Sequence, residues 1–482
     1  MAFLIGGANT LATGDLITNS LRFGVVADDS HLEFTPSSGS GATTFTFSCW
    51  VKKAKNPESG TLLGGRNDDY ALKFLGGGGT IDSKIQFIEY AGGSDDAYYI
   101  RTNRRFRDPS AWMHVVLIYD ATNGTAGNRM RLYINGTRET SFSHEVQLPQ
   151  NRVHHGFFHN NVAIRIGREV TTSGGPSSSF NGYIADVYCS DGTAYEPTEF
   201  AETNDNGVWV PKEADVSFGT NGFRLEFKET GTSANASGIG ADTSGNGNHF
   251  SVNALAAIDV TTDTPQNNFC TGNPLDVSGV DNPGDVCTFS EGNTKIVQAG
   301  SNNVVGWKAS TIGIRNGKWY FELKLPIIDY QVFGVGDATW DGQDGAADNQ
   351  FSVYIDNGTE TFRRGAGVNA AALSVTSSNN DIWMFALDLD SPKLWIGHQG
   401  TWLASGDPAA GSNPMSTQAI TDTVFIGGSL YTQNDSQILL NTGNPSYANS
   451  SSQADDNGYG DFEYDVPAGF YSICTKNLAE FG

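Results

Sequence analysis

Paired carboxylates are the side chains whose spacing alone would suggest chemistry. In Leu387-Asp388-Leu389-Asp390 the two aspartates alternate onto one face of an expected strand. Two carboxylates placed in this way serve glycoside hydrolases as acid and nucleophile. No third acid follows Asp390, however, and Ser-Pro-Lys ends the strand. We therefore interpret the pair as a strand end and a turn.

Other catalytic and metal-binding motifs are missing from the sequence. It contains no Gly-x-Ser-x-Gly elbow, no Walker phosphate loop and no His-Glu-x-x-His helix. The densest imidazole group is His154, His155 and His159. It has no visible fourth ligand, so we expect a polar loop rather than a metal site. These features predict a protein that is not an enzyme.

Acidic turns favour calcium over zinc, because hard cations bind several oxygens on flexible loops. The candidate ligands are Asn67, Asp68 and Asp69 in one turn, and Asp341, Asp344 and Asp348 in another. Neither turn has EF-hand spacing, and such turns are commonly only solvated. Both interpretations, calcium site and solvated turn, stay open.

Aromatic side chains near turns are the expected ligand-binding groups. Sugars stack their apolar faces on rings and bond their hydroxyls to amides and carboxylates. The residues expected to do so are Trp340, Trp402, Tyr98 and Tyr99. Trp50, Trp319 and Trp395 lie within strand patterns instead, and we expect them in hydrophobic cores.

Short strands joined by turns must position these residues. Phe45, Phe47, Cys49 and Val51 alternate onto one face, which predicts a half-buried strand. The Asn-Gly pair at 135–136 predicts a hairpin with a type I′ turn. A short helix is expected only in a few stretches such as 196–202, and no heptad pattern predicts a coiled coil. In the last third of the chain, strands are expected at 318–325, 331–335, 351–355, 382–389, 393–396, 424–425 and 438–440.

Composition agrees with an all-β protein of several domains. The chain has 482 residues, which predicts about two to four domains, and its 58 glycines suit many tight turns. Its 53 acidic and 29 basic residues leave a net charge of -24, which disfavours nucleic-acid binding. No apolar run is long enough for a membrane helix, and the first residues lack the pattern of a signal peptide.

Cysteine usage indicates folding in a reducing compartment. The five cysteines are widely spaced and include no Cys-x-x-Cys pair, which argues against a disulfide scaffold or a zinc site. Cys49, Cys189 and Cys474 fall in strand-like runs, where a small thiol is usually buried. We expect the protein to fold in a cytoplasm.

Four segments are expected along the chain. Residues 1–18 form a Gly-rich arm, and 19–204 form a first β-sandwich. Residues 205–285 are rich in Gly, Ser, Asn and Thr and are expected to be an irregular connector. A second β-sandwich is expected over 286–482.

Both sandwiches resemble concanavalin A-like folds. The first resembles the laminin-G-like and pentraxin-like jelly rolls through FTFSCWV (45–51), WMHVV (112–116), RLYING (131–136) and FNGYIADV (180–187). The second resembles SPRY (B30.2-like) domains through GKWYFE (317–322), FGVG (333–336), DIW (381–383), LDLD (387–390), KLWIG (393–397) and GTW (400–402).

The whole arrangement resembles virion proteins of tailed phages, especially marine ones. The supporting motifs are NSLRF (19–23), ADTSGNGN (241–248), DTPQNNF (263–269), PAGF (467–470) and CTKNL (474–478). The resemblance implies a non-enzymatic fibre, tail or head-fibre adhesin on the virion surface, assembled in the host cytoplasm. It implies an arm fastened to other virion proteins, a homotrimer, and a host-surface glycan or receptor as partner.

Two alternatives remain. The chain is expected to be a capsid decoration or tail structural protein if it binds no sugar. A glycan depolymerase is disfavoured, because the catalytic carboxylate strand is missing.

Overall fold

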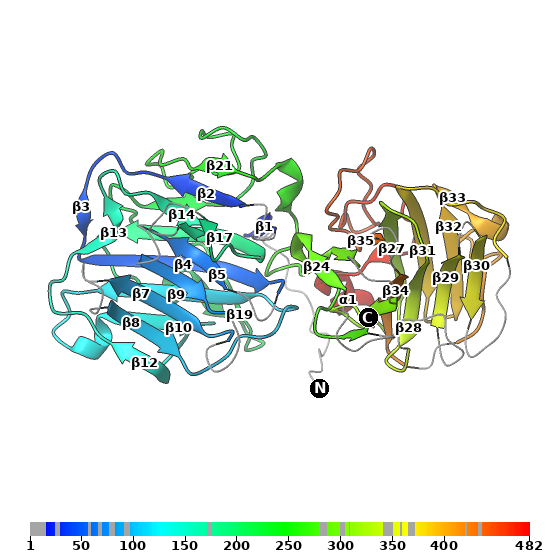
Figure 1. Cartoon of the computed structure of the whole chain (residues 1–482), viewed down its shortest axis with the longest axis horizontal. Helices are drawn as coiled ribbons and strands as arrows, with labels where there is room; N and C mark the ends of the chain where they lie inside the picture. Colours follow the sequence, from blue (N-terminus) through cyan, green and yellow to red (C-terminus); the bar gives the residue numbers. More distant parts are fainter. Residues whose placement is uncertain are drawn as a thin grey trace. The chain divides into compact units, whose positions relative to one another are not determined.

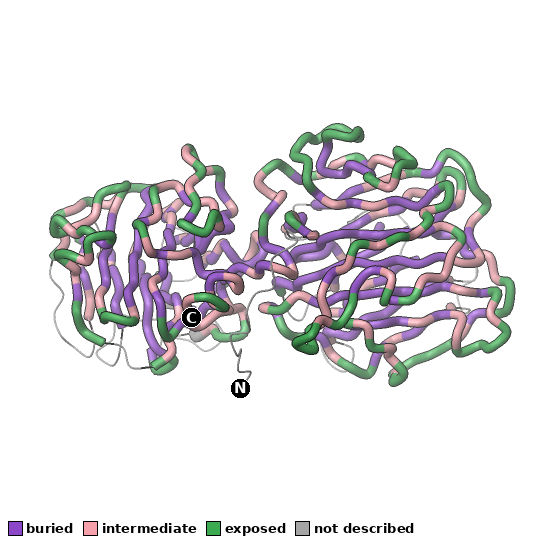
Figure 2. Tube along the Cα trace, turned by 180° about the vertical axis from the view of Figure 1, so that it is seen from behind, coloured by how far each residue is buried: buried purple, intermediate pink, exposed green. Residues whose placement is uncertain are grey.

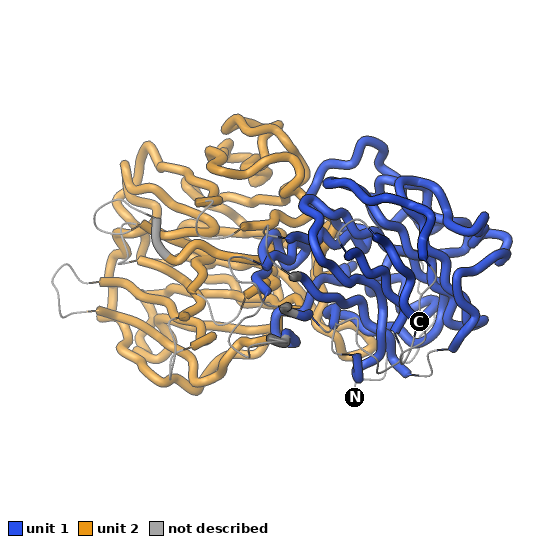
Figure 3. Tube along the Cα trace, turned by 45° about the vertical axis from the view of Figure 1, so that its right-hand side comes forward, with its two compact units in different colours: residues 1–11, 267–482 blue, residues 12–266 orange. Residues whose placement is uncertain are grey.

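In the computed structural model, strands are the main regular structure of the described residues, and a single short α-helix accompanies them (Figure 1). The described residues are 16–24, 29–55, 59–65, 70–76, 82–90, 97–170, 176–279, 287–298, 304–307, 309–340, 350–356, 359–364, 372–419, 422–431 and 436–482. Two compact units divide the chain after Gln266 (Figure 3). We call residues 12–266 the N-terminal unit and 267–482 the C-terminal unit.

The N-terminal unit is a sandwich of two antiparallel sheets. Sheet A contains β1 (Ser20–Phe23), β4 (Thr44–Lys53), β9 (Met113–Asp120), β10 (Met130–Ile134), β11 (Thr137–Arg138), β17 (Gly182–Asp191), β20 (Phe223–Leu225) and β22 (Val260–Thr261). Its order is β11-β10-β9-β4-β17-β1-β22, with β20 beside β17.

Sheet B faces sheet A across the core. It contains β2 (His31–Phe34), β5 (Gly60–Gly64), β6 (Tyr70–Phe74), β7 (Ile85–Tyr90), β8 (Ala97–Thr102), β12 (Phe142–Val146), β14 (Ile164–Ile166) and β21 (Ser251–Asn253). Its order is β12-β8-β7-β6-β5-β14-β2-β21. Smaller pairs are formed by β3 (Ser40–Ala42) with β13 (His154–His159), β15 (Glu169–Val170) with β16 (Pro176–Ser177), and β18 (Ala201–Thr203) with β19 (Trp209–Pro211).

Strand β4 shows how the alternating pattern builds the core. Phe45, Phe47, Cys49 and Val51 are all fully buried between the sheets, as the alternation predicts. The prediction that this strand is only half-buried is wrong. Its other face is also buried, because Trp50 packs against Ile17, Ala185 and Ala201 on the outside of sheet A. Figure 2 shows burial running through the strands while exposure concentrates in the loops.

Local turn chemistry is confirmed where the sequence specifies it. Asn135 and Gly136 both have positive φ, 48° and 73°, between β10 and β11, so the predicted hairpin is present. The helix expected at 196–202 is only a single 3-10 turn, Pro197–Glu199, followed by β18. Other 3-10 turns lie at Ala126–Asn128, Ala257–Asp259, Glu291–Asn293 and Leu403–Ser405.

The histidine group differs from the expected polar loop. His154 begins strand β13 and is fully buried. Its ring stacks on Phe157 with centroids 4.5 Å apart, and its Nδ1 accepts hydrogen bonds from the Gly156 and Phe157 amides. Burial holds the pKa of His154 well below its ordinary value, so the ring serves as a neutral core side chain.

The segment expected as a connector is divided between the two units. Its first part adds β20, β21 and β22 to the sheets of the N-terminal unit, where β20 pairs with β17. Its last part belongs to the C-terminal unit, which begins at Asn267 rather than at 286. The expected arm also ends differently, because Ile17 is buried on sheet A and its amide donates to Gln266 Oε1 at 2.8 Å. Residues 1–15 lie outside the described residues.

The C-terminal unit is a second two-sheet sandwich. One sheet contains β23 (Val277–Gly279), β26 (Val304–Trp307), β28 (Gln331–Asp337), β29 (Gln350–Asp356), β30 (Thr359–Arg364) and β34 (Val424–Tyr431), in the order β23-β26-β34-β28-β29-β30. The other contains β24 (Thr288–Ser290), β25 (Lys295–Val297), β27 (Lys318–Leu325), β31 (Asp381–Asp388), β32 (Lys393–His398), β33 (Thr401–Trp402), β35 (Gln437–Asn441) and β36 (Tyr471–Ser472). Its order is β24-β25-β35-β27-β31-β32-β33, with β36 parallel to β27.

Aromatic side chains from neighbouring strands fill the core of the C-terminal unit. Phe321 of β27 lies opposite Phe385 of β31, and the two rings stack with centroids 4.8 Å apart. Trp319 is fully buried and Trp395 is 1% exposed, so their predicted core positions are confirmed. The chain ends with α1 (Thr475–Phe481), which the sequence did not predict. In the described part of the chain, no helix has the length and apolar character needed to span a bilayer.

Candidate functional site

The outer face of sheet B presents a row of side chains drawn from three neighbouring strands. Ile85 and Phe87 point into the core, so Gln86 of β7 points outward. On β8, Ile100 is a core residue, and Tyr99 and Arg101 therefore share the outer face. The register places Gln86 opposite Arg101, Arg101 opposite His144 of β12, and Tyr99 opposite Val146 of the same strand.

Four of these side chains contact one another, and we call Gln86, Tyr99, Arg101 and His144 the Tyr99 platform. The Tyr99 and His144 rings stack with centroids 4.1 Å apart and an interplanar angle of 15°. Arg101 Nε donates to Gln86 Oε1 at 2.8 Å, and its guanidinium carbon lies 5.7 Å from the Tyr99 ring centroid. His144 is exposed, Tyr99 and Arg101 are half-buried, and Val146 beside them is 38% exposed.

Charge on this face leaves Arg101 available to a ligand. Two other cations of sheet B pair with carboxylates: Lys73 with Glu169 at 2.6 Å and Arg165 with Glu33 at 2.7 Å. Arg101 forms no ion pair with any carboxylate among the described residues. Because Gln86 already orients its guanidinium, Arg101 offers further N–H donors at little ordering cost.

The four aromatic residues expected to bind a ligand do not lie together on one surface. Tyr98 points to the other face of β8, where it packs partly buried against the core under the Arg152 guanidinium. Trp402 is half-buried on β33, and its ring meets Tyr320 edge-on at 6.3 Å. Trp340 is 1% exposed, so the expectation of an exposed ring there is wrong. A Cβ on Gly336 would lie 2.5 Å from the Trp340 ring, which shows how closely the backbone covers it. Of the four, Tyr99 alone belongs to a group of outward-facing polar side chains.

The six calcium candidates belong to two acidic turns of the sequence. Asn67, Asp68, Asp69, Asp341, Asp344 and Asp348 lie outside the described residues. Within the described ranges, no group of three or more His, Cys, Asp or Glu side chains is arranged to hold a metal ion.

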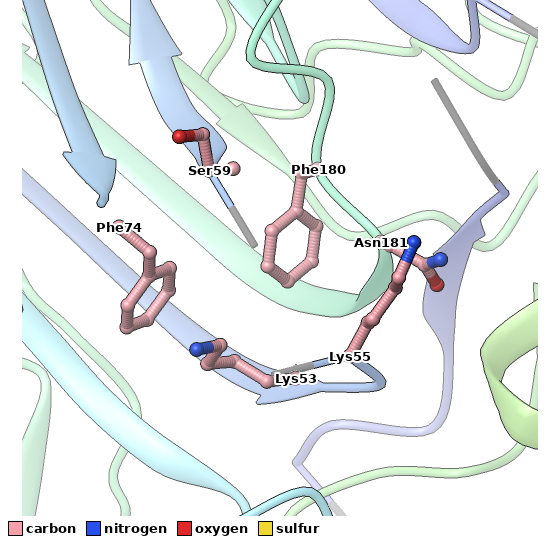
Figure 4. Close-up of a pocket in the computed structure, with 7 residues that line it drawn as sticks. Lys53, Lys55, Ser59, Phe74, Phe180 and Asn181 are labelled. Carbon is pink, nitrogen blue, oxygen red and sulfur yellow. The ribbon is translucent and has the colours of Figure 1, made fainter. Parts of the chain in front are cut away.

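A depression opens at one end of the same unit, where β4 ends and β5 begins. It is lined by Lys53, Lys55, Ser59, Gly60, Phe74, Phe180 and Asn181 (Figure 4). Gly60 is required there, because a Cβ would lie 2.9 Å from the Phe180 ring. The Lys53 ammonium donates to the Phe106 carbonyl at 3.1 Å and lies 4.7 Å from the Phe74 ring centroid. Aromatic faces and ammonium groups therefore meet at this depression.

Asn181 is the unusual residue of the depression. It is 4% exposed, yet neither its Nδ2 nor its Oδ1 has a hydrogen-bond partner among the described residues. Its backbone is held firmly, because its carbonyl accepts from the Ala54 amide at 3.0 Å. Each unsatisfied buried polar atom costs about 1–3 kcal/mol, so this amide lowers the stability of the unit.

A serine–histidine pair in sheet A resembles a nucleophile and its base. Ser48 Oγ lies 2.7 Å from His114 Nε2, but both side chains are 1% exposed. The Trp209 indole N–H donates to His114 Nδ1 at 3.1 Å, so Nε2 carries the proton and donates to Ser48. Burial lowers the pKa of His114 to about 3. His114 therefore cannot take the serine proton, and the pair is structural.

The buried carboxylates are also engaged in structural bonds. Asp388 Oδ1 accepts from the Asp390 and Ser391 amides, in the turn that the sequence predicts. Glu89 accepts from Tyr119 at 2.9 Å and Arg152 at 3.0 Å, and burial raises its pKa to about 7.

Sequence reasoning missed Gln86, Arg101, His144 and Asn181. The two-residue spacing of Tyr99 and Arg101 would have placed both on one face. His144 carries no such signal, because a register shift in β12 sets its pairing with β8. Asn181 lies in the FNGYIADV motif (180–187), whose residues indicate a fold and carry no signal of a ligand.

Comparison with known proteins identifies the fold of the first unit. Residues 26–199 match the model of the concanavalin A-like lectin/glucanases superfamily, laminin-G type. No curated protein matches the chain.

Solved structures similar to the chain include a pentraxin, a SPRY domain and a pair of laminin domains. A heptameric SAP-like pentraxin from Limulus polyphemus is 16% identical, covering 38% of this chain and 80% of its own, with a TM-score of 0.29. The SPRY domain of human HERC1 is 10% identical, with coverages of 35% and 96% and a TM-score of 0.23. Domains LG4-5 of the mouse laminin alpha1 chain are 11% identical, with coverages of 87% and 84% and a TM-score of 0.28. The chain is an almost entirely β protein, and its residues 26–199 are similar to the concanavalin A-like, laminin-G-type family.

Proposed function

We propose that this chain is a non-enzymatic surface protein of a tailed-phage particle that binds a host-surface glycan through the Tyr99 platform. The observation that carries the proposal is the Tyr99–His144 stack beside Arg101, whose guanidinium is oriented by Gln86 and has no carboxylate partner among the described residues.

The platform has the chemistry that a sugar requires. Tyr99 and the 38% exposed Val146 supply an apolar strip for the C–H face of a sugar ring. The guanidinium of Arg101 supplies planar donors for hydroxyl oxygens, and the His144 ring adds a further polar edge. All these residues lie on paired strands, which hold them more rigidly than loops would.

The virion context comes from the sequence resemblance. In this proposal a homotrimer sits on the particle, residues 1–18 contact other virion proteins, and calcium is bound at one of the two acidic turns. Assembly takes place in the host cytoplasm, and neither nucleic acid nor a membrane is a partner. The net charge of -24 supports the exclusion of nucleic acid.

Binding of the purified chain to host cells and to a glycan array, with and without calcium, tests the proposal. We expect retention on a defined glycan and at least about tenfold weaker binding for Tyr99→Ala and Arg101→Gln, since a handful of central contacts carries most binding energy. Arg138→Gln is the matched control, because Arg138 lies on sheet A and donates to the Gly127 carbonyl. Its affinity should equal that of the parent chain.

Two results would overturn the proposal. Absence of any retained glycan or host cell would favour a capsid decoration or tail structural protein. Release of oligosaccharide from host envelope would instead establish a depolymerase.

A further inference from the structure

We propose that the Tyr99 platform recognises the end of a glycan chain, its last sugar or last two sugars, rather than an internal stretch of a polysaccharide. This inference rests on the proposed glycan binding and names the ligand class. Three features of sheet B carry it: its outer face is covered on one side of the platform, it is open on the other side, and the platform itself is small.

The outer face of β5 is covered by the chain around β15. Ala71 of β6 points outward, because its neighbour Leu72 points into the core, and Gly64 of β5 lies opposite Ala71 on the same face. A Cβ on Gly64 would lie 2.3 Å from the Arg168 carbonyl oxygen, so the backbone just before β15 rests directly on this face. We call Arg168 together with β15 the wall. Behind it Ala71 is fully buried, and the outer face of sheet B is closed to a ligand there.

The wall is also bonded to β6, and the surface between it and the platform is covered. Lys73 Nζ donates to Glu169 Oε1 at 2.6 Å, and Glu169 is 1% exposed. On β7, the outward-facing Gln86 and Ile88 are 4% and 8% exposed. A sugar chain that lies on Tyr99 therefore meets covered surface in the direction of β6.

Strand β12 forms the open side of the platform. In the part of the chain that the structure describes, it is the outermost strand of sheet B (Figure 1). All its residues from Ser143 to Val146 are exposed. A glycan seated on the platform therefore continues over β12 into solvent.

The platform between these two sides has room for few sugar rings. Its apolar residues, Tyr99 and Val146, and its polar residues, Arg101 and His144, form two successive cross-strand pairs of β8 and β12. Paired strands lie about 4.8 Å apart and successive outward residues about 7 Å apart, so these side chains cover the area of about one or two sugar rings. The His144 ring already covers one face of the Tyr99 ring, so at most one sugar can stack on Tyr99.

A terminal sugar also suits the polar groups at the covered side. It carries a hydroxyl that an internal sugar lacks, because no further glycosidic bond uses that oxygen. The Arg101 guanidinium is turned toward β7, since its Nε donates to Gln86 Oε1 at 2.8 Å. Its remaining N–H groups can donate to hydroxyl oxygens at the end of a chain that enters over β12.

Competition against the binding of the full chain to host cells tests the inference. The probes are fragments of the host-surface polysaccharide, made by partial acid hydrolysis and sorted by length. We expect single sugars or disaccharides to displace the protein completely. From disaccharides to chains of about six sugars the molar affinity should rise less than about tenfold, because the added sugars extend into solvent and form no further contacts.

One variant adds a readout at the platform itself. Val146→Ala should weaken the binding of disaccharides and of the longest fragments by the same factor, about threefold, because both use the same apolar contact. Val208→Ala is the matched control, since Val208 is a valine of the same unit, is 53% exposed and precedes β19. Its affinities should equal those of the parent chain. Thermal unfolding of each variant confirms that it is folded.

The outcomes separate this inference from the proposed function. Failure of every single sugar and disaccharide to compete, or an affinity that rises about tenfold or more up to the longest fragments, would show that an internal stretch is bound. Unequal effects of Val146→Ala on short and long fragments would show the same. Each of these results overturns the inference while Tyr99-dependent glycan binding stands. Absence of binding to every fragment, to the glycan array and to host cells overturns both.

Discussion

Replacing Lys52 by Met is expected to destabilise the N-terminal unit strongly. Lys52 is 1% exposed and its ammonium forms an ion pair with Oδ2 of Asp263, which is fully buried. Asp263 Oδ1 accepts from the Trp112 indole at 2.9 Å, and the ammonium lies 4.6 Å from the Tyr183 ring centroid. This network fixes the last residues of the unit on the outer face of sheet A.

The magnitude follows from what the substitution leaves behind. Methionine keeps most of the lysine stem, so little packing is lost, but the Asp263 carboxylate stays buried without its cation. Removing one partner of a buried ion pair costs about 3–5 kcal/mol. For a unit of this size, each kcal/mol shifts the melting temperature by about 2–4 °C, so the expected loss is roughly 6–20 °C.

Calorimetric unfolding of the full chain measures this loss in the transition of the N-terminal unit. Lys228→Met is the matched control. Its side chain is 47% exposed in its pair with Glu226, so the change should cost less than about 1 kcal/mol. The double variant Lys52→Met with Asp263→Leu should be less destabilised than the sum of the two single variants. A loss below about 1 kcal/mol for Lys52→Met, or simple additivity in the double variant, would refute the reasoning.

Three further predictions concern other buried polar groups. Asn181→Ala should leave the unfolding free energy unchanged or raise it by about 1 kcal/mol, because it deletes two unsatisfied atoms; a loss above about 1 kcal/mol in urea unfolding would show that the amide has a structural partner. Burial raises the pKa of Glu89 from 4.5 to about 7, so the native state keeps a proton that the unfolded chain releases in this range. The unfolding free energy should therefore fall as pH rises from about 4.5 to 7. Urea midpoints measured across this window should show the fall, and Glu89→Gln should flatten it. An unfolding free energy that rises with pH would contradict this prediction. Glu322 accepts hydrogen bonds from Tyr320, Asn441 and two backbone amides, so Glu322→Gln places an NH₂ group against these donors. Calorimetry should show a loss of about 2–4 kcal/mol in the stability of the C-terminal unit, while glycan affinity stays unchanged.

Several strands could be predicted from the sequence because their signals are local. The expected strand at 318–325 coincides with β27 (Lys318–Leu325), and the one at 382–389 lies within one residue of β31 (Asp381–Asp388). Alternation of apolar and polar residues needs no knowledge of distant contacts, since the backbone itself turns successive side chains to opposite faces. The turn at Asn135 and Gly136 was equally predictable, because these residues tolerate positive φ.

The exposure of individual aromatic residues could not be predicted in this way. The sequence pattern places Trp340, Tyr98 and Tyr99 alike near expected turns, yet of these three only Tyr99 belongs to the outward-facing platform. Whether a ring near a turn is covered depends on chain segments far away in the sequence. The unit boundary was missed for the same reason, since β20 joins sheet A by pairing with β17 at Cys189 and Phe223, 34 residues apart.

The sequence by itself determined an acidic, all-β chain with two aromatic-rich sandwiches, because strand period and turn chemistry depend on neighbouring residues. Only the tertiary structure decided which polar groups meet. Lys52 pairs with Asp263, which lies 211 residues away in the sequence. Arg101 bonds to Gln86 because strands β7 and β8 pair in the register that places these residues opposite each other. The burial of the Asn181 amide and the absence of a hydrogen-bond partner for it among the described residues are likewise known only from the structure. Burial and hydrogen bonding are properties of the packed fold, so a local pattern cannot specify them.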